Sequence, residues 1–463
     1  MVVPRFLPPL DCCFLPAVLV NRAFREEVRA TQAGVPLVLG LERPDGSVSR
    51  LETQVFPETH PGAENNLAYA ERLFKFLLWQ RGGFQAYVGG PRAVGEAIRR
   101  IYAAGGAREF DSHFMAQDVY ERTFAVVVCE PDQVPAEQER SQPLGRHLDG
   151  YRIGFDLGAS DRKVAAVVNG QTVFSEEVAW DPVAHKDPQY HYREIMAALH
   201  TAASRMHHVD AVGGSAAGIY IDNQPRIASL FRGIPKNRFG EIRTLFLRIR
   251  DEVGVPLEVV NDGEVTALAG SMSLEENGVL GIALGSSEAA GYVRLDGCLT
   301  GWLNELAFAP IDYSPDAPME EWSGDRGCGA TYLSQQCVFR LAPKAGILIP
   351  TGITKAEQLK FVQTELEAGH AGAVQIWQSM GVYLGYALAH YADFYELKHV
   401  LLLGRCTSGR GGQILLDGAR QVLRGEFPEL DSQIQIQLPD EQSRRVGQAI
   451  AAASLPRIER EKA

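Results

Sequence analysis

The sequence predicts an α/β protein with more than one domain. Apolar strand-like segments alternate with amphipathic helix-like segments along most of the chain, a pattern typical of sheets with parallel strands. The chain has 463 residues, which is longer than a chain that folds around a single hydrophobic core, so two or three domains are expected. Two glycine-bearing hairpins, at 151–170 and 278–297, suggest two related halves.

The composition narrows the class of protein. Hydrophobic residues make up 46% of the chain and charged residues 22%, as in ordinary globular proteins. The formal net charge of −12 argues against nucleic acid or an anionic membrane surface as the main partner. The seven cysteines are scattered without CxxC spacing, which is typical of free thiols. No apolar stretch has the pattern of a signal peptide or the length of a membrane span, so we expect a cytoplasmic protein.

The N-terminal part, 1–148, is expected to be a smaller α/β or α+β domain of unknown role. Residues 35–56 alternate apolar and polar side chains around a Pro-Asp-Gly turn, which predicts a β-hairpin. Residues 65–83 have an amphipathic pattern closed by two glycines, which predicts a helix. A strand, a helix and a second strand are expected to follow at 84–90, 91–106 and 124–130. The Pro- and Gln-rich stretch 131–150 is typical of a linker.

Helices and strands continue to alternate after the linker. Helices are expected at 190–206, 238–254, 373–395 and 414–427. Strands that lead into turns or helices are expected within 209–221, 256–272, 399–412 and 434–455. Ligands of α/β proteins bind at the carboxyl ends of such strands, so the turns that follow them are candidate sites.

The first candidate turn follows Asp156 in the hairpin at 151–170. Gly158 permits close approach to the backbone, Ser160 offers a hydroxyl, and Asp156 can hold a divalent cation through water. An ordinary hairpin turn explains the same residues.

The second candidate is Asn261-Asp262, at the end of an apolar strand. A carboxylate there can accept a proton from a substrate hydroxyl, as a general base does. Asp262 can equally be the cap of the helix that follows.

Two further turns have the character of nucleotide sites. In the first, backbone N–H groups near Gly285 with the hydroxyls of Ser286 and Ser287 can receive phosphate oxygens. In the second, Gly404 precedes a Ser/Gly loop in which Arg405 can bind phosphate or remain a solvated charge. Ordinary turns explain both segments as well.

The order of these motifs resembles that of the sugar kinase, actin and Hsp70 superfamily, and most closely that of the ROK family of sugar kinases and sugar-sensing repressors. The resemblance covers about residues 150–455. It implies a two-lobed actin-like ATPase fold of the ribonuclease H type, with lobes at 149–270 and 271–463 and a C-terminal helix that returns to the first lobe. It further implies phosphorylation of a sugar or related polyol, with ATP and Mg²⁺ as cofactors.

The resemblance also assigns roles on the sugar side. The segment "VNDGE" resembles the family's catalytic segment, which makes Asp262 the general base and Asn261 a sugar contact. The segment from Gly213 resembles a substrate loop, with Ser215 and Asn223 as candidate contacts. Glu305 in "LNELAF" stands in the place of the family's sugar-binding glutamate.

On the nucleotide side, "DLGAS" resembles the family's phosphate loop. Asp156 is then expected to organise Mg²⁺ through water, with the phosphates faced by Gly158, Ala159 and Ser160. The other expected nucleotide contacts are Gly285, Ser286, Ser287, Gly404 and Arg405.

Several residues depart from the family pattern. "LGSSEAAG" lacks two of the phosphate-loop glycines, and Glu288 adds a negative charge near the expected phosphates. Phe308 replaces a histidine that contacts sugar and zinc, and Cys328 is the lone cysteine of the segment that resembles the zinc loop. No zinc site is therefore expected. The turn 323–327 is interpreted as structural or as lining the cleft.

These departures keep a second function open, namely a sugar- or nucleotide-binding sensor without kinase activity on the same fold. Nothing in the first block has the pattern of a helix-turn-helix, so a role on nucleic acid is not expected. A homodimer is compatible with the sequence. We expect a small sugar or polyol as the main ligand and no membrane partner.

Overall fold

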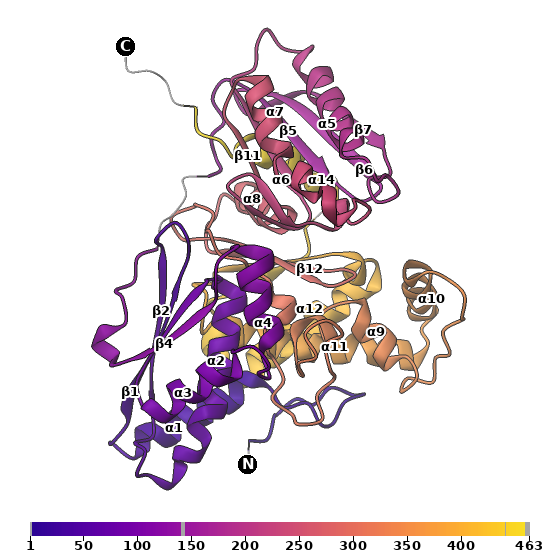
Figure 1. Ribbon diagram of the computed structural model, residues 1–463. Coiled ribbons are helices and arrows are strands. Elements are labelled where there is room, and N and C mark those ends of the chain that lie inside the picture. Colours follow the sequence, from indigo (N-terminus) through magenta and orange to yellow (C-terminus); the bar gives the residue numbers. More distant parts are fainter. Residues whose placement is uncertain (1, 140–143, 440, 459–463) are drawn as a thin grey trace. The chain divides into compact units, whose positions relative to one another are not determined.

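The computed structural model describes residues 2–139, 144–439 and 441–458 (Figure 1). Strands and helices interleave along the chain, as predicted for an α/β protein. The chain forms two compact units. The large unit comprises Met1–Arg140, Ile282–Ala289 and Trp302–Leu438, and the small unit comprises Ser141–Gly281, Ala290–Gly301 and Pro439–Ala463.

The small unit contains a sheet of five strands in the order β11-β8-β5-β6-β7. The strands β5, β8 and β11 are parallel, whereas β6 and β7 are antiparallel to their neighbours. The predicted hairpin at 151–170 is the pair β5 and β6. The bounds of the strands are Tyr151–Leu157 (β5), Asp161–Val168 (β6), Gln171–Ala179 (β7), Ala211–Ala216 (β8) and Leu257–Asn261 (β11). A separate short hairpin is formed by Ile219–Ile221 (β9) and Gln224–Ile227 (β10).

Helices cover both faces of this sheet. One face buries an apolar core with α5 (Pro188–Ala203), α6 (Phe239–Arg243) and α7 (Leu245–Val253). The other face receives α14 (Glu441–Ala453), which packs on α8 (Asp262–Leu274). A Cβ atom at Gly154 or Gly213 would collide with main-chain carbonyls of α14, so glycine at these two strand positions lets the helix lie directly on the sheet.

The first sheet of the large unit has four strands in the order β2-β1-β3-β4. The predicted hairpin at 35–56 is the antiparallel pair β1 and β2, and β3 is parallel to β4. The bounds of the strands are Val35–Glu42 (β1), Val48–Val55 (β2), Gln85–Gly89 (β3) and Ala125–Cys129 (β4). Helices accompany this sheet at Ala17–Ala30 (α1), Asn66–Arg81 (α2), Arg92–Ile101 (α3) and Glu109–His113 (α4).

The predicted linker at 131–150 is ordered at its start. Val48 and Gln138 exchange two backbone hydrogen bonds of 2.9 Å beside β2. The Glu139 carboxylate lies 2.6 Å from the Arg43 guanidinium and is largely buried. Residues 131–139 therefore pack against the first sheet, and the boundary between the two units falls within the predicted linker, after Arg140. Residues 140–143, in the middle of the predicted linker, lie outside the described part of the chain.

The second sheet of the large unit has the order β13-β12-β14-β15. The predicted hairpin at 278–297 supplies β12 (Val279–Leu284) and β13 (Glu288–Val293), and its tip, Ile282–Ala289, belongs to the large unit. The remaining elements are β14 (His399–Leu403), β15 (Gln435–Gln437), α9 (Gln335–Leu341), α10 (Lys355–Glu367), α11 (Ala371–Tyr391), α12 (Arg410–Glu426) and α13 (Pro428–Asp431). Among the described residues, no helix combines the length and the apolar character needed to span a bilayer.

Candidate functional site

The carboxyl edge of the small unit's sheet carries Asp156, Ser215 and Asn261 at the ends of β5, β8 and β11. Asp156 is paired with Ser215 in the register of the sheet, and Asn261 is paired with Ala216. The hydroxyl of Ser215 donates a hydrogen bond of 2.7 Å to Oδ1 of Asp156. The parallel strands thus bring these predicted site residues to one edge.

Asp262 is the first residue of α8, and Asn261 is the N-cap of this helix. Oδ1 of Asn261 accepts a 2.7 Å hydrogen bond from the backbone N–H of Gly263, and its Nδ2 donates to the carbonyl of Gly218 at 2.7 Å. Oδ1 of Asp262 also accepts from Gly263, at 3.0 Å. The capping role that the sequence left open for Asp262 is therefore filled mainly by Asn261.

The carboxyl group of Asp156 affects the pKa of Asp262. Burial and the neighbouring Asp156 carboxylate raise the pKa of Asp262 to about 6. Burial also raises the pKa of Asp156, an effect opposed by the hydrogen bond from Ser215 and by the charge of Lys163. Like charges that share a site raise the pKa of one member. Asp262 thus titrates close to neutrality, where a general base is most effective.

Lys163 is a residue of this edge that the motif comparison missed. It is the cross-strand partner of Asp156 in the β5–β6 register, and its Nζ lies 3.8 Å from Oδ2 of Asp156 and 3.3 Å from Oδ1 of Asp161. The hairpin pattern of the sequence contained this signal, because the two strands of a short-loop hairpin place Asp156 opposite Lys163. The edge therefore contains a cation beside its carboxylates.

The turn after Asp156 is held by its own residues. The backbone N–H of Gly158 donates to the carbonyl of Asp161 at 2.9 Å, and the Ser160 hydroxyl donates to the Asp161 carboxylate at 2.9 Å. Trp180, the residue after β7, holds the turn through its indole N–H, which donates to the carbonyl of Gly158 at 2.8 Å. Ala159 and Ser160 are exposed at the tip of the turn.

Asn223 lies in the turn between β9 and β10, away from the ends of β5 and β8. Its Nδ2 donates to the carbonyl of Leu257 at 3.0 Å, and its Oδ1 accepts from the backbone N–H of Val259 at 2.6 Å. Both ends of the amide therefore fasten the short hairpin to β11.

The predicted nucleotide loops are neighbours in the large unit, because they follow the adjacent strands β12 and β14. Gly285 begins the turn that exposes Ser286 and Ser287. Gly404 has a φ of 93°, and a Cβ atom there would lie 2.5 Å from the carbonyl oxygen of Leu284. Glycine is thus required where these strand ends approach each other. The next residue, Arg405, is exposed.

Glu288, the first residue of β13, does not place a charge on the phosphate turn. Its carboxyl group is buried, accepts a 2.9 Å hydrogen bond from the hydroxyl of Tyr391 on α11, and faces Gly329. Burial raises the pKa of Glu288 to about 8, so the group is largely neutral at pH 7. The interpretation of Glu288 as a negative charge beside the phosphates is therefore corrected.

The N-terminus of α12, which follows the Gly404 loop, is capped by an acidic side chain. The backbone N–H of Arg410 donates to Oε1 of Glu367, from the end of α10, at 2.8 Å. A helix N-terminus that holds a carboxylate is not free to receive a phosphate group.

Glu305 lies in a loop between Trp302 and the 3₁₀ turn η6 (Leu306–Phe308). Its backbone N–H donates to the carbonyl of Trp79, in the last turn of α2, at 3.1 Å. Phe308 is 9% exposed and stacks on Trp79 with ring centroids 4.2 Å apart. Phe308 thus belongs to an apolar core that α2 supplies.

Within the described residues, no cluster of three or more His, Cys, Asp or Glu side chains could hold a metal. Cys328 is buried, and its thiol lies 3.9 Å from a carboxylate oxygen of Asp325. Asp156 and Asp262 offer oxygen ligands of the kind that Mg²⁺ takes together with substrate phosphates.

Comparison with solved structures shows which fold this is. A ROK-family transcriptional regulator described as a homologue of the E. coli MLC protein is 18% identical, with a TM-score of 0.51 over 70% of this chain and 82% of its own. The ROK hexokinase from Thermus thermophilus is 17% identical, with a TM-score of 0.50 over 65% of this chain and 98% of its own. A ROK glucokinase from Streptomyces griseus, in complex with glucose and AMPPNP, is 22% identical, with a TM-score of 0.48 over 65% of this chain and 99% of its own.

These likenesses define the class of fold. The chain has the actin-like ATPase fold of ROK-family proteins, in a divergent form. Sugar kinases and a transcriptional regulator are both among the structures with this fold. No protein-family model matches the sequence, and no curated protein matches it either.

Proposed function

We propose that this protein transfers the terminal phosphoryl group of ATP to a hydroxyl group of a sugar or related polyol, with Asp262 as the general base. The observation that carries the proposal is the Asp156–Asp262 pair at the carboxyl edge of the small unit's sheet, where burial and Asp156 raise the pKa of Asp262 to about 6. A carboxylate with that pKa is ionised at neutral pH and basic enough to take a proton from an attacking hydroxyl. The likeness in fold to a hexokinase supports the same choice.

Other residues of the site have proposed parts as well. Asn261 caps α8 and so fixes the backbone that carries Asp262. Glu305 is proposed to hold sugar hydroxyls. Asp156 would hold Mg²⁺ through water, and the cation, when bound, neutralises and orients the phosphates. The backbone of Gly158 and Gly285 is proposed to receive phosphate oxygens, with Ala159, Ser160, Ser286 and Ser287 beside it and Gly404 and Arg405 at the nucleoside.

The buried position of Glu288 supports the kinase function. A carboxylate on the phosphate turn would repel ATP, whereas a neutral carboxyl beside Tyr391 does not. Lys163 supports it too, since an ammonium group beside Asp156 offsets negative charge where the phosphates are proposed to bind.

A second candidate function is sensing of a sugar or nucleotide without phosphoryl transfer. Two observations favour it: Glu367 occupies the N-terminus of α12, and the fold is shared with a transcriptional regulator. The two candidates differ in one measurable respect. A sensor binds its ligand without consuming ATP.

The test is steady-state turnover of ATP with a panel of hexoses, N-acetylhexosamines and polyols, for the natural protein and Asp262→Asn. We expect the substitution to lower kcat by about two to four orders of magnitude while the affinity for sugar is largely kept. Asp251→Asn, an exposed carboxylate of α7 in the same unit, is the matched control and should leave turnover unchanged. Sugar binding without any sugar-dependent ATP consumption would favour the sensor.

A further inference from the structure

The loop that carries Glu305 is attached to the end of α2. The carbonyl oxygen of Trp79 accepts a 3.1 Å hydrogen bond from the backbone N–H of Glu305, and that of Gln80 accepts a 2.9 Å hydrogen bond from Asn304. The last carbonyl groups of a helix have no partners within the helix. Here the Glu305 loop supplies those partners, so the backbone of Glu305 is fixed by a helix from the N-terminal part of the chain.

The side chain of Trp79 fixes the same loop a second time. Its ring is fully buried and stacks on Phe308, three residues beyond Glu305, with a centroid distance of 4.2 Å. The indole N–H donates a 2.8 Å hydrogen bond to Oδ1 of Asp111 in α4. The orientation of the ring is therefore set on one side by stacking and on the other by a buried carboxylate.

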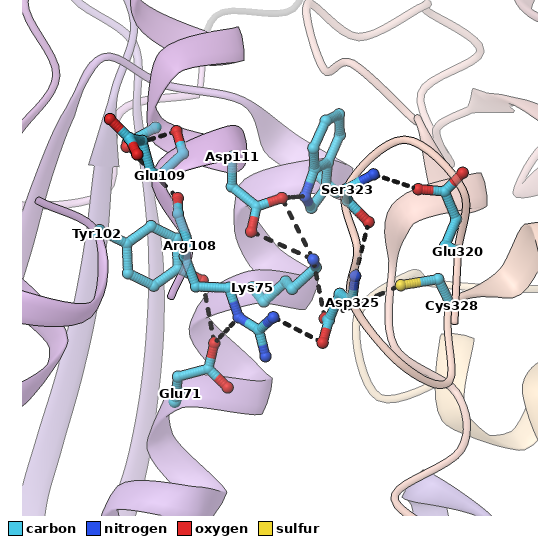
Figure 2. A network of polar contacts seen from close by, with 12 residues as sticks. Glu71, Lys75, Tyr102, Arg108, Glu109, Asp111, Glu320, Ser323, Asp325 and Cys328 are labelled. Atoms are coloured by element: carbon cyan, nitrogen blue, oxygen red, sulfur yellow. Dashed lines mark hydrogen bonds and ion pairs between the residues drawn. The ribbon is translucent and has the colours of Figure 1, made fainter. Parts of the chain in front are cut away.

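Asp111 is part of a buried ionic cluster that joins α2 and α4 to a distant loop (Figure 2). Nζ of Lys75 lies between Asp111, at 3.2 Å, and Asp325, at 2.9 Å, and Lys75 and Asp111 are almost completely buried. Asp325 also pairs with Arg72 at 2.9 Å and with Arg108 at 2.6 Å. Glu71 completes the set, which then has three cations and three anions.

The cluster gives the turn 323–327 a structural role, one of the two that the sequence left open. A buried charge that loses its partner is strongly destabilising, so separating the segments that this cluster joins is costly. Lys75, one turn of helix before Trp79, is thereby held in a fixed position relative to Asp111 and Asp325. The end of α2 is thus tied to α4 and to the turn 323–327.

A third set of contacts holds the start of the loop. The guanidinium of Arg81 lies 3.2 Å from the centroid of the Trp302 ring, and the indole N–H of Trp302 donates to Glu139 at 3.0 Å. The hydroxyl of Tyr395 donates to Oδ1 of Asn304 at 2.9 Å. The loop is therefore held on both sides of Glu305.

We propose that the last turn of α2, with Trp79 at its centre, is the positioning element of the Glu305 loop, so that the N-terminal part of the chain is a working component of the sugar-binding side. The role of Glu305 toward sugar rests on the proposed function. The positioning of its loop rests on the contacts above. Trp79 acts through the loop and touches no substrate.

The experiment is hydrogen–deuterium exchange of peptides that cover 302–309, in the natural protein, Trp79→Leu and Trp79→Phe. Leucine cannot stack on Phe308 or bond to Asp111, so we expect the Asn304 and Glu305 amides to exchange at least about tenfold faster. Phenylalanine keeps the stacking and should restore most of the protection. If Trp79→Leu does not fold, Phe308→Leu removes the same stacking from the loop side.

The matched control is Asn66→Ala, at the opposite end of α2. The side chain of Asn66 bonds to the backbone N–H of Phe56 at 3.0 Å and to its carbonyl at 2.7 Å, so its loss weakens the N-terminal part far from Trp79. We expect no change of exchange at 302–309 in this variant. The proposal would be overturned if the amides of 302–309 exchanged as slowly in Trp79→Leu and Phe308→Leu as in the natural protein. It would also be overturned if Asn66→Ala speeded their exchange as much as Trp79→Leu does.

Kinetics separate this proposal from the proposed function. In Trp79→Leu we expect the KM for sugar to rise about tenfold, a loss of the size of one good contact, while kcat and the affinity for ATP change little. Faster exchange together with an unchanged KM would show that the loop is positioned by Trp79 but that Glu305 does not hold sugar. In that outcome the positioning stands and the assignment of Glu305 falls.

Discussion

The hydroxyl of Tyr391 donates a 2.9 Å hydrogen bond to Oε1 of Glu288, while Oε2 of Glu288 is buried without a hydrogen-bond partner among the described residues. A carboxylate in this position would leave negative charge uncompensated in the interior, which is costly. A protonated carboxyl group avoids that cost, and the pKa of about 8 that burial produces is consistent with it. Glu288, which the sequence suggested would repel the phosphates of ATP, is thus a neutral part of the core.

Glu288→Gln is therefore expected to fold and to bind ATP as the natural protein does. The pKa of Glu288 is raised in the folded state, so between about pH 4.5 and 8 the folded natural protein binds one more proton than the unfolded protein does. Its free energy of unfolding therefore falls as pH rises through this window, by up to about 1.4 kcal/mol per pH unit. Glutamine does not titrate, so Glu288→Gln removes this contribution to the pH dependence of stability. Urea unfolding at pH 6 and pH 9 should show a smaller loss of stability on the alkaline side in the variant; an equal loss in both proteins would contradict the assignment.

The pH dependence of turnover is predicted by the Asp156–Asp262 pair. A general base works in its ionised form, and burial with Asp156 raises the pKa of Asp262 to about 6. We therefore expect kcat/KM to be level above about pH 7 and to fall about tenfold per pH unit below pH 6. Asp156→Asn removes the neighbouring charge and should move the break to lower pH. A break that stays in place would show that the charge of Asp156 does not set it, and would leave burial of Asp262 or another group as its source.

Lys163 provides a test of the cation at this edge. Its ammonium group, 3.8 Å from Asp156, opposes the rise in the pKa of Asp156 that burial causes. We expect Lys163→Met to raise the Kd for ATP with Mg²⁺ by about tenfold, because the substitution removes one charge-assisted contact to the phosphates. Calorimetric titration measures this, with Lys163→Arg as the charge-keeping control. Equal affinity in the methionine variant would place the phosphates away from β6.

The sequence predicted the α/β class and the carboxyl edge of the small unit's sheet because local patterns determine them. Alternating strands and helices identified β5, β8, β11 and α8, and the strand ends then placed Asp156, Ser215 and Asn261 together. A helix predicted at 238–254 is divided at Thr244 into α6 and α7. Short elements such as α4 and the β9–β10 hairpin carry too few residues for a periodic pattern to appear.

The roles of Glu288, Phe308 and Asp325 were not predictable because they depend on segments far away in the chain. Glu288 meets Tyr391, Phe308 meets Trp79, and Asp325 meets Lys75, all at sequence separations that no local pattern reports. A charged or aromatic side chain beside a glycine turn looks like a ligand contact when its partner is unknown. The tertiary partner, supplied here by α2 or α11, makes it part of the core.

The ionic cluster around Asp325 is expected to contribute strongly to the stability of the protein. Asp325→Ala leaves Lys75, Arg72 and Arg108 without their shared carboxylate in a buried setting, so we expect a loss of about 3–5 kcal/mol in the free energy of unfolding. Asp393→Ala removes the partly exposed ion pair with Arg25 in the same unit and should cost about 1 kcal/mol or less. Urea denaturation of both variants gives the comparison. Similar losses would mean that the cluster around Asp325 contributes no more than a partly exposed ion pair, and that the end of α2 is held in place by other contacts.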